Sequence, residues 1–131
     1  MSEIPYDATY QPPAPVLDIA LMAPATGSRV KLTGIIDTGA DATIIPLQFL
    51  QQIGARRVFA TGLKSQWGER RTVFLYLVDV RISSITLPAI YVVGDELGED
   101  IVVGRDVLNR LRILLNGPDA VAQIWDTAQN R

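Results

Sequence analysis

Residues 35–46 read IIDTGADATIIP and place two carboxylates, Asp37 and Asp41, between two pairs of isoleucines. The apolar flanks predict that this stretch is buried, and a buried carboxylate is costly unless it is paired or used. Asp37 directly follows the first isoleucine pair, so it is the residue whose presence needs an explanation.

Composition places the chain among ordinary globular proteins. It has 131 residues, 48% of them hydrophobic and 20% charged, which suits one domain. The net charge of −2 lacks the electrostatic footprint of a nucleic-acid binder, so no nucleic-acid partner is expected. No apolar run reaches transmembrane length and the first residues lack a signal-peptide pattern, so we expect no membrane contact and a cytoplasmic location.

Two missing residue types narrow the chemistry that the chain can perform. There is no cysteine and no histidine. Disulfides, Cys nucleophiles, Ser-His-Asp triads and zinc sites of the usual Cys/His kind are therefore excluded. Carboxylates are the best-supplied catalytic groups, because the chain has 14 acidic residues.

Short apolar segments separated by turn residues predict a mainly β domain, a closed or strongly twisted barrel-like sheet. One short helix is expected after DTGAD, with Pro46 at its first position and Gly54 as its stop, and a second is expected from Arg105. AVAQIW at 120–125 is expected to form a hairpin with RILL across the turn NGPD. The remaining strands are expected over 16–22, 29–37, 56–62, 71–82, 85–93 and 101–103.

The first residues differ in composition from the rest. Residues 1–15 contain four prolines, which predict an extended arm that cannot be a helix. We therefore divide the chain into a Pro-rich N-terminal arm, 1–15, and a domain, 16–131.

Each residue of DTGAD has a plausible chemical role. Asp37 would act as acid or base, Thr38 offers a hydroxyl that fixes the turn, and Gly39 lets a backbone approach closely. Asp41 could accept hydrogen bonds from the main chain of a substrate. The motif is also compatible with an ordinary turn, because Asp, Thr and Gly are common turn residues.

A second segment, IVVGRDVL at 101–108, combines an apolar strand, a glycine, an Arg-Asp pair and a helix start. Gly104 lies 67 positions after Asp37. Together the two segments resemble the retropepsin family of aspartic proteases, in which a hydrophobic run with DTG[AS]D is followed some distance later by a hydrophobic pair and Gly-Arg-Asp/Asn. The resemblance covers roughly residues 16–115 and is strong at 35–45 and 101–111.

The resemblance implies a retropepsin-like barrel and assigns roles to the matching residues. Asp37 would be the catalytic aspartate and Thr38 would hydrogen-bond across a dimer. Gly39 and Ala40 would line the substrate backbone, and Asp41 would bind the substrate main chain.

Gly104 and Arg105 would support the active-site loop, with Arg105 paired to Asp41. The competing interpretation of Arg105 and Asp106 is an exposed helix N-terminus, where an acidic residue is favourable in any case.

A single DTG implies a homodimer. Aspartic protease chemistry needs two carboxylates that share a proton, and the near-copy WDTA at 125–128 lacks the glycine. The second aspartate would be Asp37 of another copy, on a two-fold axis. The implied activity is hydrolysis of a polypeptide substrate by water, without metal or cofactor. The Pro-rich arm and AVAQIW are candidates for the dimer interface.

A retropepsin also needs a flap that covers the substrate, and the best candidate is TGLKSQWGERR at 61–71. Trp67 and Gly68 would contact the substrate there. Trp67 could equally be a partner contact or a lid over the barrel.

Two rival interpretations remain open. One is a catalytically silent retropepsin-fold module that dimerises or binds extended peptides. The other is an unrelated small β-barrel in which DTGAD is only a turn.

Overall fold

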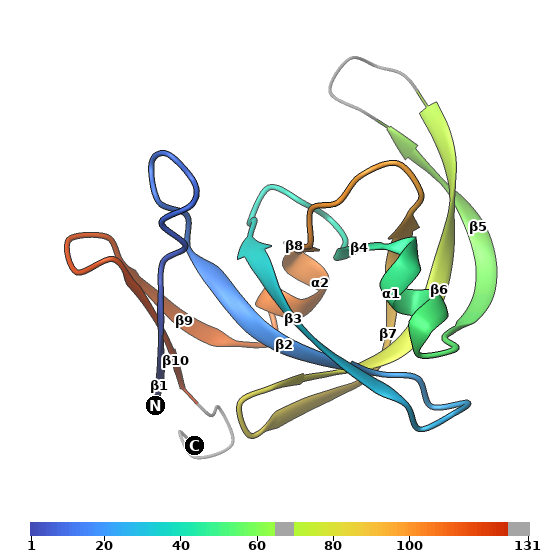
Figure 1. Ribbon diagram of the computed structural model, residues 1–131, viewed down its shortest axis with the longest axis horizontal. Coiled ribbons are helices and arrows are strands. Elements are labelled where there is room, and N and C mark those ends of the chain that lie inside the picture. Colours follow the sequence, from blue (N-terminus) through green and yellow to red (C-terminus); the bar gives the residue numbers. More distant parts are fainter. Residues whose placement is uncertain (65–69, 126–131) are drawn as a thin grey trace.

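The computed structural model describes residues 1–64 and 70–125, and its architecture is mainly β (Figure 1). The strands are β1 (Ser2–Pro5), β2 (Val16–Met22), β3 (Arg29–Ile36), β4 (Ile44–Pro46), β5 (Arg56–Lys64), β6 (Arg70–Ile82), β7 (Ile85–Asp95), β8 (Val102–Val103), β9 (Arg112–Asn116) and β10 (Val121–Trp125), and the helices are α1 (Leu47–Gln52) and α2 (Arg105–Leu108). Among the described residues, no helix is long and apolar enough to cross a membrane.

The larger sheet closes on itself. Its strand order is β2-β3-β8-β4-β7-β6-β5, and β2 also pairs with β6. The closing contact joins Ala20–Met22 to Asp79–Arg81 in antiparallel register. The expected barrel-like sheet is thus confirmed, with β5 lying on the outer side of β6 (Figure 1).

Side chains of β2, β3, β6 and β7 fill most of the barrel interior. In β2, Leu17, Ile19 and Leu21 are buried while Asp18 is exposed, as the two-residue period of a strand requires. These side chains belong to one hydrophobic core, which extends to Ile45 of β4 and Leu50 of α1. The same core therefore includes residues of both β2 and β6, the two strands whose pairing closes the sheet.

The segment after DTGAD differs from expectation in one respect. The expected helix is present as α1, and Gly54 follows it with a φ of +68°, which suits a glycine stop. However, Ile44–Pro46 form the short strand β4, which the sequence did not predict, so Pro46 precedes the helix and Leu47 is its first residue. The reason is tertiary: β4 pairs in parallel with β7 and meets β8 on its other side, and both partners are distant in sequence.

Both ends of the described chain lie in a second, three-stranded sheet of order β1-β10-β9. The expected hairpin of residues 112–125 is confirmed, with Val121 opposite Asn116. Within residues 1–15, β1 pairs antiparallel with β10, and a bridge between Asp7 and Ala14 closes a loop. Hydrogen bonds from the Thr9 hydroxyl and the Thr9 N–H lower the pKa of Asp7 in that loop.

We predict that Leu21→Ala lowers the free energy of unfolding by about 2 to 5 kcal/mol, because it leaves a cavity where β2 pairs with both β3 and β6. Leu97→Ala is the matched control: this leucine is 79% exposed, and its loss should change stability by less than about 0.5 kcal/mol. Urea denaturation at one protein concentration measures both. Equal effects of the two substitutions would contradict the assignment of β2 to the barrel closure.

Candidate active site

Asp37 begins the loop that connects β3 to β4, and its backbone is held by β8. The N–H groups of Ile35 and Asp37 donate to the carbonyl oxygens of Ile101 and Val103, at 2.8 and 3.0 Å. This parallel pairing continues past the end of β3, so the backbone of Asp37 is fixed on the sheet although it lies outside the strand.

The carboxylate of Asp37 points away from the core. Its Oδ1 accepts a hydrogen bond from the Gly39 N–H at 2.8 Å, and among the described residues Oδ2 accepts none. The expectation of burial, drawn from the isoleucine flanks, is wrong for this side chain, because Asp37 is exposed in the single chain while Ile36 and Ile45 are buried. The chain turns outward at the end of β3, so the apolar pairs line the core and the loop between them does not.

Arg105 ties the loop together from the other side. Its N–H donates to the Ala40 carbonyl at 2.9 Å, and its Nη1 donates to the Thr38 carbonyl at 2.8 Å. Nη2 forms an ion pair with Asp41, the partner that the resemblance implied. The Arg105 and Asp41 side chains are 42% and 87% exposed, so we expect the pair to contribute little stability and chiefly to set the loop's shape.

Gly104 is required by close contact between two backbone segments. A Cβ at this position would lie 2.6 Å from the carbonyl carbon and oxygen of Ala42 and 3.0 Å from the Ala40 oxygen. Its φ of −95° is unstrained, so space and not backbone conformation demands the glycine. The β8–α2 junction thus lies directly against the loop that carries Asp37.

A buried link between Thr43 and Asp106 was not expected from the sequence. Thr43 is fully buried, and its N–H and hydroxyl donate to the two Asp106 oxygens at 3.0 and 2.7 Å. The Thr43 hydroxyl oxygen also accepts the Gly104 N–H at 3.1 Å. Neither Arg105 nor Asp106 is therefore a merely solvated helix start. The available signal was a threonine within an apolar run, which needs a partner when buried.

The structure thus brings together residues 37–41 with Gly104 and Arg105. Trp67 and Gly68, the predicted substrate contacts of the flap, lie outside the described residues. The arms of that hairpin are described: β5 and β6 pair as far as Lys64 opposite Arg70. In Figure 1 this hairpin extends on the same side of the barrel as the loop after β3.

The loop offers one chemically useful group, the Asp37 carboxylate, held in a defined position. Asp37 is exposed, one of its oxygens is fixed by Gly39, and its backbone is held by β8. Within residues 1–64 and 70–125, no group of three or more acidic side chains is arranged to hold a metal ion. One carboxylate of this kind is half of what acid–base hydrolysis by a pair requires.

Comparison with known proteins identifies the fold. No protein-family model and no curated protein matches the chain. Among solved structures, EIAV protease complexed with the inhibitor HBY-793 matches with a TM-score of 0.56 and 17% identity, over 74% of this chain and 86% of that chain. The retroviral protease-like domain of Ddi1 from Leishmania major matches with a TM-score of 0.49 and 19% identity, over 83% and 87%.

The likeness to the EIAV protease establishes the class of the structure: the chain has a retropepsin-like fold. The fold implied by residues 35–45 and 101–111 is therefore confirmed. At 17% identity the likeness concerns the fold alone.

We predict that Gly104→Ala destabilises the protein by about 1 to 3 kcal/mol, because the atoms that the new methyl group meets are backbone atoms of the Asp37 loop. Gly117→Ala is the control, since a Cβ at Gly117 meets no heavy atom within 4 Å. Its effect should stay below about 0.5 kcal/mol in the same denaturation assay. A Gly104→Ala variant as stable as the control would contradict the close approach.

Proposed function

We propose that the protein is a homodimeric aspartic endopeptidase in which Asp37 of each copy supplies one catalytic carboxylate. The observation that carries the proposal is the exposed Asp37 carboxylate, held on the β3–β4 loop by β8 and Arg105 within a retropepsin-like fold. An exposed carboxylate on a rigid loop is ready to meet a second one without rearranging its own backbone.

The requirement for a second chain follows from the count of such motifs. The sequence contains one DTG, and its near-copy at 126–128 reads DTA. Two carboxylates about 3 Å apart share one proton, because like charges at that distance cannot both ionise easily. A two-fold axis passing beside Asp37 supplies that arrangement from one kind of chain.

Hydrolysis by such a pair balances with water as the only added reactant. The ionised Asp37 takes a proton from water, whose oxygen bonds to the scissile carbonyl carbon, while the protonated Asp37 gives its proton to the carbonyl oxygen. The first carboxyl then protonates the amide nitrogen and the second takes a proton from the diol as the C–N bond breaks. The products are a carboxylic acid and an amine, and the pair again holds one proton.

The loop around Asp37 suits an extended peptide substrate. Gly39 has no side chain to obstruct a substrate backbone, Ala40 has only a methyl group, and Asp41 offers a carboxylate that is mostly exposed. The β5–β6 hairpin would cover the bound peptide, with Trp67 and Gly68 in contact with it. We therefore assign polypeptides as the substrate class.

The terminal sheet supplies a candidate contact between the two copies. Strand β10, which contains most of AVAQIW, lies between β1 and β9, so in the described chain the open edges of this sheet belong to β1 of the N-terminal arm and to β9. Leu114 and Leu115 on β9 are 47% and 48% exposed. An open edge with apolar side chains is normally covered, and antiparallel pairing with β9 of a second copy would cover it.

The proposal is tested by incubating the purified protein with a mixed peptide library from about pH 4 to 8, at several protein concentrations. We expect cleavage that Asp37→Asn reduces by at least about 100-fold, since an amide cannot exchange the proton. Asp119→Asn is the matched control, because it makes the same change in an exposed turn and should retain activity.

Each of the other outcomes also discriminates between the proposed function and its alternatives. Cleavage that survives Asp37→Asn contradicts the assignment of Asp37. No cleavage at any pH, by a protein that light scattering finds to be dimeric, favours the catalytically silent module. Specific activity that rises with protein concentration supports a dissociating dimer.

A further inference from the structure

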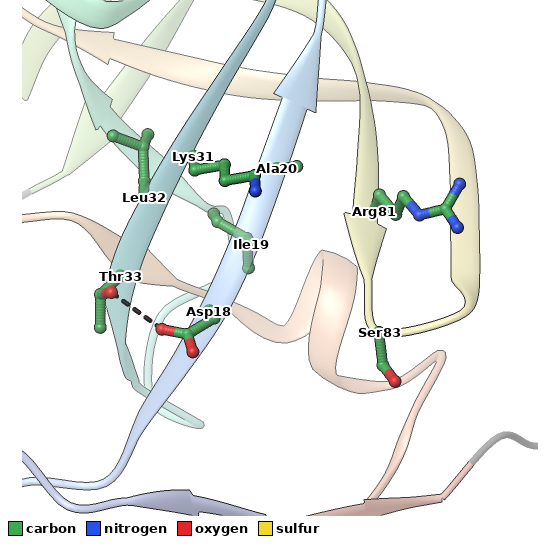
Figure 2. A pocket seen from close by; sticks show the side chains of 8 residues that line it. All are labelled: Asp18, Ile19, Ala20, Lys31, Leu32, Thr33, Arg81 and Ser83. Atoms are coloured by element: carbon green, nitrogen blue, oxygen red, sulfur yellow. Dashed lines mark hydrogen bonds between the residues drawn. The ribbon is translucent and has the colours of Figure 1, made fainter. Parts of the chain in front are cut away.

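A surface trough outside the Asp37 loop lies where strands β2 and β6 separate. β2 pairs with β3 along all seven of its residues but with β6 only over Ala20–Met22. At Ser83 the chain turns away with a φ of +56°, which leaves a trough of about 540 Å³, here named the β2–β6 fork (Figure 2). Lys31 and Thr33, which line the fork, precede Asp37 by six and four residues, roughly 20 and 13 Å along a strand.

Two cations border this trough on either side of a small residue. Ala20 is opposite Lys31 of β3 and opposite Arg81 of β6, so all three side chains face outward. Figure 2 shows the Lys31 ammonium directed toward Ala20 and the Arg81 guanidinium directed away from it. Within the described ranges neither cation has an ion pair or a side-chain hydrogen bond.

Two carboxylates on the same face accept hydrogen bonds from neutral groups. The Asp18 carboxylate accepts the Thr33 hydroxyl at 2.9 Å, and the Asp79 carboxylate accepts the Ala89 N–H at 3.0 Å. A third cation, Arg29, lies opposite Met22 on the same face. Three cations on this face therefore stand against two carboxylates, which leaves one excess positive charge in a chain whose net charge is −2.

The backbone of Asp18 also faces the fork. The Ile36 N–H donates to the Pro15 carbonyl at 3.0 Å, so every second residue from Pro15 onward directs its backbone groups toward β3. Asp18 and Ala20 direct theirs the other way. Ala20 meets Arg81, whereas Asp18 has no partner residue in β6.

We propose that the β2–β6 fork binds an acidic segment of a polypeptide in extended conformation. The segment would place carboxylates near Lys31 and Arg81 and would pair one residue of its backbone with Asp18. Such a strand addition combines main-chain hydrogen bonds with side-chain recognition. This site is separate from the Asp37 loop and does not depend on catalysis.

Geometry favours a peptide over other anions. The two cationic groups point in different directions from strands on opposite sides of β2, so one compact phosphate does not satisfy both as they stand, while spaced carboxylates do. A nucleic-acid strand is not favoured, because the chain is acidic overall and lacks a basic tract.

The test uses the full chain carrying Asp37→Asn, so that the probe is not cleaved. The probe is a fluorescein-labelled peptide of alternating glutamate and threonine, and anisotropy is measured at low and at moderate ionic strength. We expect salt-sensitive binding that Lys31→Gln/Arg81→Gln weakens by at least about ten-fold. Ala20→Leu, which fills the floor of the trough without changing charge, should also weaken it.

The matched control is Arg56→Gln/Arg110→Gln, which removes the same charge from exposed positions elsewhere and should alter binding by less than about two-fold. Thermal unfolding verifies that each variant folds. Absence of binding, or equal loss in the control pair, overturns the proposal. So does a glutamine-for-glutamate peptide that binds equally well, or inorganic phosphate or single-stranded DNA that binds the fork in place of the acidic peptide.

Discussion

The pairing of β8 with two strands that are far from it in sequence is the constraint on which the candidate site depends. β8 lies parallel to β3 and antiparallel to β4, so the chain between those two strands has to pass over the β8–α2 junction. Gly104 permits this passage because its missing side chain leaves room for the Ala40–Ala42 backbone. Asp37 is then held just past the end of β3, where its backbone N–H bonds to β8 and its side chain lies outside the core.

The contacts around this crossing form a buried group and an exposed group. Inside, Thr43 and Asp106 satisfy each other's polar groups, and Thr43 also accepts the Gly104 N–H. Losing one member would leave buried polar atoms without partners, which costs about 1 to 3 kcal/mol. Outside, Arg105 reaches Thr38 and Asp41 in solvent, where it shapes the loop and adds little stability. Buried hydrogen bonds therefore hold the loop on its inner side, and the Arg105 side chain holds it on its exposed side.

Sequence alone predicted the parts of this arrangement that rest on local patterns. The long alternating strands, the helix that ends before Gly54 and the hairpin at 112–125 followed from periodicity and turn residues, and the retropepsin-like fold followed from the family resemblance of two motifs. The sequence did not predict the features that depend on contacts between residues far apart in the chain. β4 and β1 are three and four residues long and exist because of their sheet partners. The exposure of Asp37 depends on where the chain leaves β3, and the Thr43–Asp106 link joins residues 63 positions apart.

The measurement that tests the central claim most directly is a mixing experiment between the unchanged chain and Asp37→Asn, refolded together at constant total concentration. If one catalytic site needs Asp37 from two copies, mixed dimers are inactive, and activity falls as the square of the fraction of unchanged chain. If each chain forms a complete site by itself, activity falls in direct proportion to that fraction. A linear decline would contradict the account.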